Sequence, residues 1–310
     1  MLEGAHRPGG QAAPSSYVRA LRIPFVSSSL APVAFGLVLA IGEADTSWLA
    51  GLLALLAGAI VQLGTNVCNS VCDYERGVDT FDMAGDARTF VDGDLTISEG
   101  RWWYRILFSV AVLLGLGIAA LTGPAILPLG AVGVFMAWAY TAGPWPYKYH
   151  ALGEPLIILL MGALMTLGGY VAVTGHWWDW SAIAAGLPFG FAVAAVLTAN
   201  NLCDIEDDRA AGVTTLAGVL GFEWARRLYY CELVAVYAAI LLLVAFGSIH
   251  PLCLIALASI PLAVARVRVV HAARGPGDTA LEPVLQATAM LHFAVGIPLV
   301  AAELIGRGLL

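Results

Sequence analysis

Charged residues are scarce in this chain. Asp, Glu, Lys and Arg together make up 12% of its 310 residues, whereas hydrophobic residues make up 60%. A soluble globular domain has roughly a quarter charged residues and about half apolar ones, so this balance excludes an ordinary soluble protein. Because no polar stretch is long enough for a separate soluble domain, we predict one membrane domain over residues 18–310, after a polar tail over residues 1–17.

Several common functional patterns are also missing. The five cysteines include no CxxC pair, which argues against a disulfide framework or a zinc site. The six histidines form no HxxH or HExxH pattern, and the chain has neither a Gly-rich phosphate loop nor a GxSxG elbow. No basic tract points to a nucleic-acid partner. We also expect no cleavable signal peptide, because no short apolar stretch with a cleavage site follows the polar start.

Long apolar runs are what the chain does contain. Each run is close to the roughly 20 residues that a helix needs to cross a bilayer. They cover residues 24–42, 48–67, 105–122, 124–140, 153–173, 181–199, 226–246, 250–270 and 286–305. We therefore predict an all-α integral membrane protein with nine transmembrane helices, which makes the lipid bilayer a partner of the chain.

The basic residues set the expected orientation. All 15 Lys and Arg residues except Arg307 fall before the first apolar run, in alternate connections between runs, or at the ends of the runs that border these connections, and the opposite turns contain none. By the positive-inside rule, the N-terminus and the long polar loops face the cytoplasm. We therefore expect a multi-pass protein of the cell (inner) membrane.

Two acidic clusters stand at matching places, each at the end of a long apolar run. The first contains Asn66, Asn69, Asp73 and Asp79, and the second contains Asn200, Asn201, Asp204 and Asp208. On a helix, Asn69 and Asp73 share a face, and so do Asp204 and Asp208. Carboxylates at a membrane surface are costly unless they are wet, paired or bound to cations. Both clusters lie on the predicted cytoplasmic side, so we predict that they converge.

Oxygen ligands alone suit Mg²⁺ better than zinc or copper. Magnesium keeps several waters and usually bridges to phosphate oxygens, so the natural ligand of such a site is a diphosphate. Basic residues at the same membrane surface could hold that diphosphate and stabilise the charge of the leaving group. The candidates are Arg22, Arg88, Lys148 and Arg209.

These residues are similar to the motifs of a known family. The chain resembles the UbiA-type superfamily of intramembrane prenyltransferases, and within it the branch that prenylates 1,4-dihydroxy-2-naphthoate for menaquinone. The first superfamily motif corresponds to Asn69 and Asp73, with its last carboxylate at Asp79, and the second corresponds to Asp204 and Asp208. ARTFVDGDLT resembles the Arg-containing loop after the first motif, and YTAGPWPYKYHALGE the loop between helices 4 and 5.

The resemblance implies nine helices ringed around a central cavity, with the acidic motifs at its cytoplasmic mouth. It implies Mg²⁺ ligands, which we assign to the set Asn66, Asn69, Asp73, Asp79, Asp204 and Asp208. The diphosphate would contact Arg22, Arg88, Lys148, Arg209, Asn201 and Tyr140, with Asp73, Asp208 and Lys148 taking the catalytic roles.

The leading hypothesis is Mg²⁺-dependent transfer of a polyprenyl group from a prenyl diphosphate to an aromatic acceptor through an allylic carbocation. A UbiA-type terpene cyclase, which ionises the same donor without an acceptor, is the alternative. A transporter or lipid-binding membrane protein is a third hypothesis, although transport sites more naturally lie near the midplane of the bilayer.

Overall fold

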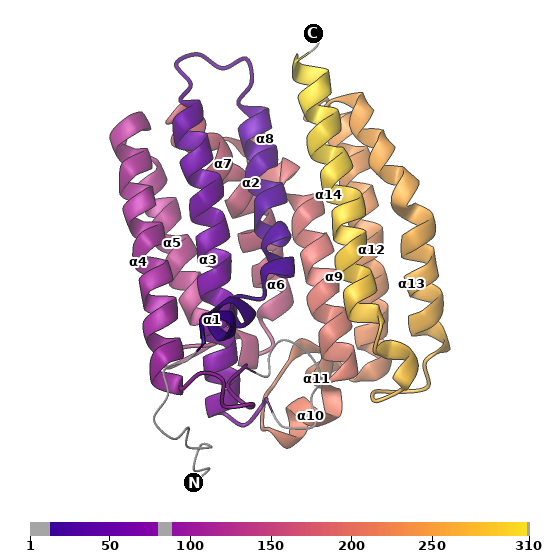
Figure 1. The fold of residues 1–310 in the computed structure, drawn as a ribbon. Coiled ribbons are helices and arrows are strands. Elements are labelled where there is room, and N and C mark those ends of the chain that lie inside the picture. Colours follow the sequence, from indigo (N-terminus) through magenta and orange to yellow (C-terminus); the bar gives the residue numbers. More distant parts are fainter. Residues whose placement is uncertain (1–12, 80–88, 309–310) are drawn as a thin grey trace.

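The structure, a computed structural model, describes residues 13–79 and 89–308, and it contains no β-strand in these ranges. Long helices run side by side across the molecule (Figure 1). Seven helical segments of the described chain are long and apolar enough to cross a membrane. They are α3 (Trp48–Glu75), α4 (Ile97–Thr122), Gly153–Thr174, Trp180–Cys203, α12 (Phe222–Ala245), Pro251–Ala272 and Thr279–Gly308.

Two shorter apolar helices occupy the other two predicted segments, α2 (Ser27–Leu39) and α5 (Ile126–Ala139). All nine predicted apolar segments are thus largely helical, while nine membrane crossings remain a prediction because α2 and α5 are shorter. The separation of the predicted runs 105–122 and 124–140 is present, since Gly123 has a φ of 97° and lies between α4 and α5.

Several helices continue past the apolar runs that predicted them. Helix α3 extends to Glu75 and so carries Asn69 and Asp73 on its last turns. Helix α4 begins at Ile97, where Thr96 and Glu99 form a reciprocal capping box. Hydropathy marks only the part of a helix that lies in hydrocarbon, whereas caps set where its hydrogen bonding starts.

Four of the long segments are interrupted. Gly153–Thr174 consists of α6 (Gly153–Ile157), the π-helical turn η4 (Ile158–Leu164) and α7 (Met165–Thr174). Trp180–Cys203 consists of α8 (Trp180–Ala185) and α9 (Leu187–Cys203). The segment Pro251–Ala272 begins with the 3₁₀ turn η5 (Pro251–Ser259) before α13 (Ile260–Ala272), and η6 (Thr279–Leu281) precedes α14 (Val284–Gly308).

Close helix packing uses glycine where η4 meets α9. A Cβ atom added at Gly162 would lie 2.6 Å from the carbonyl oxygen of Gly186, and one added at Gly190 would lie 2.3 Å from that of Ile158. Such approaches admit no side chain, which is why small residues concentrate at helix interfaces in membrane proteins. The same holds between α2 and α7, where an added Cβ at Gly36 would lie 2.0 Å from the carbonyl oxygen of Thr166.

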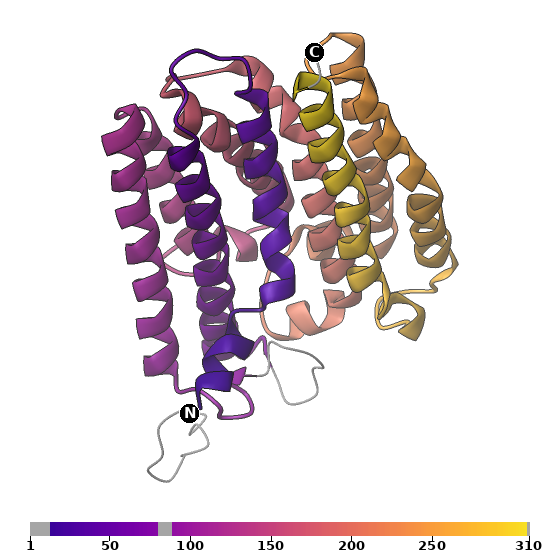
Figure 2. The ribbon, with the colours of Figure 1, turned by 45° about the horizontal axis from the view of Figure 1, so that its top comes forward.

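One end of the bundle carries the short elements, namely α1 (Pro14–Ala20), η1 (Ile23–Val26), η3 (Tyr147–Tyr149), α10 (Ile205–Ala210) and α11 (Leu216–Leu220). Figures 1 and 2 show α1, α10 and α11 at that end and the end of α14 at the opposite one. The predicted tail boundary at residue 17 falls inside α1.

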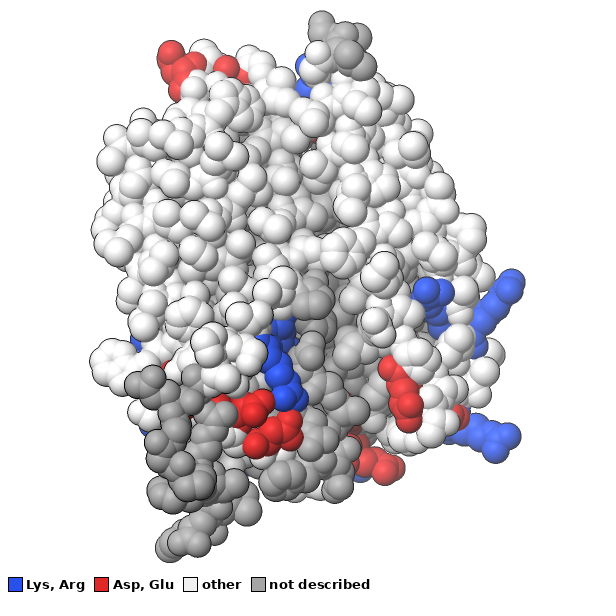
Figure 3. All heavy atoms as spheres, in the orientation of Figure 1, with Lys and Arg blue, Asp and Glu red and all other residues white. Residues whose placement is uncertain are grey.

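Charge is distributed as the basic-residue count predicts. In Figure 3 a broad uncharged band separates the lower end, where most of the visible Lys and Arg side chains gather, from a few charges at the top. Arg307, the exception in the count, donates to Glu303 at 2.7 Å and to the carbonyl oxygen of Leu39 at 3.0 Å. This supports a multi-pass membrane protein; which side of the membrane the lower end faces remains a prediction.

Candidate active site

The first acidic motif lies on the last turns of α3. The side-chain amide of Asn69 donates to the Asp73 carboxylate at 2.7 Å, one helical turn away. After the helix ends, the chain curls back on it, because the N–H groups of Val78 and Asp79 donate to the carbonyl oxygen of Asp73 at 2.9 and 3.4 Å. The predicted helix face of Asn69 and Asp73 is thus present, and the turn brings Asp79 back to it.

Lys148 and Tyr149 cover this motif. The Lys148 Nζ atom donates to Asp73 Oδ2 at 2.7 Å and to Asn69 Oδ1 at 3.2 Å, and the Tyr149 hydroxyl donates to Asp73 Oδ1. Asp73 is 3% exposed, so these contacts compensate a buried carboxylate that would otherwise be costly. Burial, together with the neighbouring Asp73 charge, raises the pKa of the Tyr149 hydroxyl, which keeps it a hydrogen-bond donor.

The second motif surrounds a helix break. We predicted a continuous helix face for Asp204 and Asp208, but α9 ends at Cys203 and α10 begins at Ile205, with Asp204 between them at φ −99° and ψ 9°. The two residues still lie together, because the Asp208 N–H donates to the Asp204 carbonyl oxygen at 2.8 Å. Asn200 donates to the Asp204 carboxylate at 2.8 Å.

A connection between the two loops brings the motifs to one place. The Ala151 N–H donates to the carbonyl oxygen of Thr214 at 2.9 Å, and His150 and Thr214 form an isolated β-bridge. The loop that carries Lys148 thereby lies against the segment that follows α10. Lys148 forms an ion pair with Asp73, and its positive charge also lowers the carboxyl pKa of Asp79, Asp204 and Asp208. The predicted convergence of the two clusters is therefore present.

Carboxylates in this group are poorly compensated. Burial raises the pKa of Asp79 to about 7, and the charge of Asp73 raises it further. Burial also raises the pKa of Asp204 and of Asp208 to about 6, with Lys148 opposing the shift in both. One carboxylate oxygen of Asp79 and one of Asp208 are buried and have no hydrogen-bond partner among the described residues. Each motif thus offers an unsatisfied anionic oxygen.

These oxygens fit a hard divalent cation. Within the described ranges, no three Asp, Glu, His or Cys side chains already stand at metal-ligand positions. The available donors are nevertheless carboxylate and amide oxygens, the set that Mg²⁺ prefers, and Mg²⁺ usually takes only one or two carboxylates together with waters and phosphate oxygens. A cation held here would satisfy the unpaired oxygens of Asp79 and Asp208.

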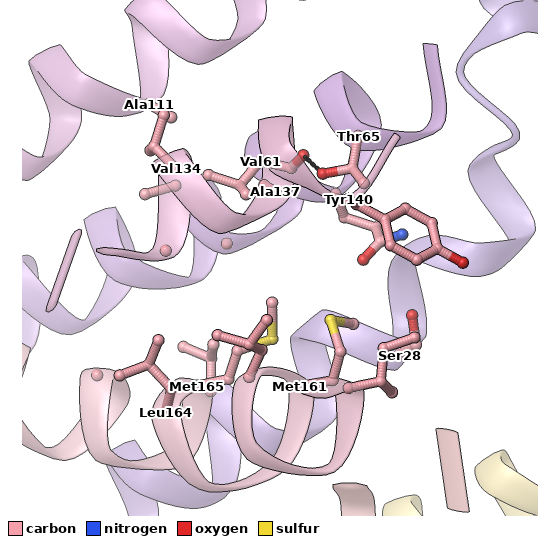
Figure 4. Close-up of a pocket in the computed structure, with 18 of the residues that line it drawn as sticks. Ser28, Val61, Thr65, Ala111, Val134, Ala137, Tyr140, Met161, Leu164 and Met165 are labelled. Atoms are coloured by element: carbon pink, nitrogen blue, oxygen red, sulfur yellow. Dashed lines mark hydrogen bonds between the residues drawn. The ribbon is translucent and has the colours of Figure 1, made fainter. Parts of the chain in front are cut away.

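A cavity of about 630 Å³ opens beside the motifs. Asn69, Lys148, Tyr140, Asn200 and Arg22 line its polar part. The rest is largely apolar, and Figure 4 shows Val61, Ala111, Val134 and Ala137 opposite Met161, Leu164 and Met165. Apolar walls with a few polar groups are typical of a cavity for a mostly hydrocarbon ligand with one polar end.

Some predicted site residues have other partners or do not line the cavity. Asn66 lines the cavity, but its amide donates to the Leu21 carbonyl oxygen at 2.8 Å and its own oxygen accepts from Gln62 at 3.0 Å, so it ties α3 to the segment after α1. Asn201 donates to buried Glu154 at 2.8 Å and does not line the cavity. Arg209 is exposed on α10 and does not line it either. Arg88 lies outside the described residues.

Some residues that the sequence did not indicate contact the site residues. Arg76 donates to the Thr141 carbonyl oxygen at 2.7 Å and its guanidinium lies 4.6 Å from the ring centre of Tyr149. The Thr215 hydroxyl donates to Asp208. Single Tyr, Thr and Arg residues form no pattern; only the position of Tyr149 beside Lys148 could have drawn attention to it.

Comparison with known proteins finds a matching family and several similar sequences. The model of the UbiA prenyltransferase family matches residues 29–288. The 1,4-dihydroxy-2-naphthoate octaprenyltransferase of Mycobacterium tuberculosis is 31% identical over 285 residues, which cover 91% of this chain and 95% of the relative. A UbiA prenyltransferase domain-containing protein 1 homolog of Drosophila melanogaster is also 31% identical, over 93% of this chain and 79% of the relative.

Solved structures share the fold. A UbiA homolog from Aeropyrum pernix superposes with a TM-score of 0.71 at 16% identity, over 90% of this chain and 98% of the homolog. One from Archaeoglobus fulgidus bound to GPP and Mg²⁺ gives 0.61 at 17% identity, over 92% and 99%. The predicted resemblance is confirmed by the family match over most of the chain: this protein belongs to the UbiA prenyltransferase family.

Proposed function

We propose that this protein transfers a polyprenyl group from a prenyl diphosphate to an aromatic acceptor of the 1,4-dihydroxy-2-naphthoate type, in a reaction that requires Mg²⁺. One observation carries the proposal: carboxylates from both motifs gather around Lys148, which, together with Asn69 and Asn200, lines the polar part of a cavity that is otherwise largely apolar. The naphthoate octaprenyltransferases at about 30% identity support the acceptor class.

A prenyl diphosphate donor fits a cavity that has one polar part and is otherwise largely apolar. Its diphosphate belongs at Lys148, Asn69 and Asn200, and its hydrocarbon chain belongs between α3, α4, α5 and the η4–α7 segment. Asp73 and Asp79 from one motif and Asp204 and Asp208 from the other would hold Mg²⁺, which would supply positive charge to stabilise the departing diphosphate. The GPP and Mg²⁺ bound to the Archaeoglobus homolog support this assignment.

Lys148 has a specific part in this account. Its ammonium group pairs with Asp73 at 2.7 Å. A bound diphosphate offers the ammonium group additional anionic oxygens, and the charge-assisted hydrogen bond strengthens as negative charge builds up on the leaving group. The C1–O bond of the donor then breaks to give an allylic cation and diphosphate.

The acceptor ring completes the reaction by attacking C1, which forms the new carbon–carbon bond. The ring carbon then loses its proton and aromaticity returns. The apolar walls of the cavity, such as Val61, Val134 and Leu164, exclude water that would otherwise capture the cation as an alcohol. Transfer therefore depends on an acceptor ring that reaches C1 before water does.

A direct test incubates the purified protein with C10 to C40 prenyl diphosphates, with and without 1,4-dihydroxy-2-naphthoate. Transfer predicts a prenylated product only when the acceptor is present. A hydrocarbon or terpene alcohol formed at full rate without the acceptor would contradict transfer and establish the cyclase alternative.

The site is also proposed to face the cytoplasm of a cell membrane. The basic residues at the end of the bundle that carries the motifs support this orientation. Single cysteines introduced at positions 177 and 207, in a variant without the native cysteines, should be labelled from opposite sides. Labelling of position 207 by an impermeant reagent added to intact cells would contradict the orientation.

A further inference from the structure

His292 is a buried polar side chain in an apolar part of the cavity wall. It lies on α14 and is 4% exposed, and its Nε2 atom has no hydrogen-bond partner among the described residues. Four residues of α14 line the cavity, and the other three are Leu285, Ala289 and Phe293. Because a buried polar atom without a partner costs free energy, the unpaired nitrogen points to a ligand group that would satisfy it.

The position of His292 along α14 indicates which ligand can reach it. Cys203, the last residue of α9 before Asp204, donates to the carbonyl oxygen of Leu281, so the start of α14 is level with the second motif. His292 is eight residues beyond Val284, which places it about 12 Å further along the helix. A ligand bound at His292 therefore lies deeper than the diphosphate site but on the same cavity.

The surrounding wall differs from the wall proposed for the prenyl chain. Gly296, one turn beyond His292, packs against α2 and α9, since an added Cβ would lie 3.3 Å from Ala31 and 3.4 Å from the Phe189 ring. On the α2 side, Ser27 and Ser28 also line the cavity. The walls formed by α4 and α5 offer only apolar side chains and glycine to it. A polyprenyl chain has no group that can pair with an imidazole, so it has no reason to lie at His292.

We propose that His292 binds the aromatic acceptor by a hydrogen bond to one of its ring hydroxyl groups and thereby selects hydroxylated rings. This inference rests on the proposed transfer reaction and adds a residue that determines acceptor specificity. A neutral imidazole nitrogen that accepts from the hydroxyl also increases the electron density of the ring, which favours attack on an allylic cation. The prenyl chain then occupies the side of the cavity formed by α4, α5 and α7.

The test compares His292→Phe, which removes the nitrogen atoms, with His292→Gln, which keeps a hydrogen-bonding group. Phe293→Leu is the matched control, because Phe293 is the neighbouring cavity-lining residue. Steady-state rates are measured with geranylgeranyl diphosphate and three acceptors, namely 1,4-dihydroxy-2-naphthoate, 1-hydroxy-2-naphthoate and 4-hydroxy-2-naphthoate. Mg²⁺-dependent binding of the donor is measured in parallel.

With the dihydroxy acceptor, His292→Phe should raise the acceptor KM about tenfold or more, since the hydroxyl loses a buried partner. The KM for the donor and its Mg²⁺-dependent binding should stay within twofold of wild type. The penalty should vanish for the one monohydroxy acceptor that lacks the contacted group, and His292→Gln should recover part of the loss. Phe293→Leu should show no such dependence on the acceptor.

Two results would overturn the proposal. One is a higher donor KM with an unchanged acceptor KM, which would place His292 beside the prenyl chain. The other is the same penalty with all three acceptors, which would make His292 a structural residue. If the wild-type protein prenylates none of the three while still binding donor and Mg²⁺, the proposed acceptor class fails first, and the inference falls with it.

Discussion

The two acidic motifs differ in how their charge is compensated. Asp73, in the first, lies within a continuous helix and is neutralised by Lys148 and Tyr149. Asp208, in the second, follows a helix break and keeps an unpaired, buried carboxylate oxygen. Asp73 is therefore paired within the protein, whereas Asp208, like Asp79 of the first motif, keeps a carboxylate oxygen without a partner among the described residues. Asp208 and Asp79 thus have more to gain from a cation than Asp73 has.

The largest expected effect comes from removing a carboxylate of either motif. Asp73→Ala and Asp208→Ala should each lower turnover by orders of magnitude, because both weaken the hold on the metal that stabilises the leaving group. Rates of prenyl transfer at saturating Mg²⁺ measure this. If Asp208→Ala retained near-normal turnover, the second motif would not act in catalysis.

The control for this experiment is Glu206→Ala, on α10 beside the second motif but exposed. It should leave the rate within a few-fold of wild type. Two other acidic residues near the first motif are poor controls. Asp94 pairs with Arg19 at 2.8 Å, and Glu99 caps α4, so replacing either would also destabilise the fold.

Removing Lys148 should make the two motifs more alike. Lys148→Met leaves Asp73 without its cation, and the diphosphate loses a charged partner at the same time. We expect a tenfold or larger rise in the donor KM and a fall in kcat, with partial recovery in Lys148→Arg. An unchanged donor KM would show that Lys148 only compensates Asp73.

The raised pKa values of the motif carboxyl groups predict how the stability of the protein depends on pH. The folded-state pKa values of Asp204 and Asp208, about 6, and of Asp79, about 7, lie above the ordinary aspartate value. Stability from a raised carboxyl pKa is complete below the unfolded value and is lost as pH rises through the folded one. In EDTA, the melting temperature should therefore fall between about pH 4 and pH 7.

Bound Mg²⁺ should reverse that trend, because it prefers the ionised carboxylates. Melting curves in Mg²⁺ should show little loss of stability above pH 7, and the Mg²⁺ concentration that gives half-maximal activity should rise as pH falls from 7 to 5.5. Asp208→Asn should flatten part of the slope in EDTA. A slope that does not change in Asp208→Asn would contradict the assignment to the second motif.

Much of this arrangement followed from the sequence, for identifiable reasons. The apolar runs predicted the helices because span length is set by the bilayer, and the Asn and Asp spacing placed Asn69 and Asp73 on one helical face. The helix break at Asp204 was not predicted, because no glycine or proline marks it in the sequence. The π-helical turn η4 was not predicted either, because it accompanies packing against α9, a contact that the local sequence does not show.

The partners of the motifs were harder to predict. Tyr149 and Thr215 reach the carboxylates through loops whose course depends on the contact between Ala151 and Thr214. Conversely, Arg209 sits one residue from Asp208, yet α10 turns it outward into an exposed position. Sequence distance from a motif is therefore a weak guide wherever a short helix reorients neighbouring side chains.

The smallest expected effects come from those supporting hydroxyl groups. Tyr149→Phe and Thr215→Val each remove one hydrogen bond to a motif carboxylate, a loss of about 1.5 kcal/mol at the lower end of the range for charged groups, which is about tenfold in rate. Tyr149→Phe should act with Lys148→Met non-additively, because both residues contact Asp73. Additive effects of these two changes would show that the contacts are energetically independent.

The most direct test of the account asks whether both motifs hold one diphosphate through Mg²⁺. Calorimetric titration with farnesyl thiodiphosphate, a slowly ionised donor analogue, measures this in wild type, Asp73→Asn and Asp208→Asn. The account predicts binding that disappears in EDTA and is weakened at least tenfold by either substitution. Wild-type affinity in EDTA, or in either variant at the same Mg²⁺ concentration, would contradict it.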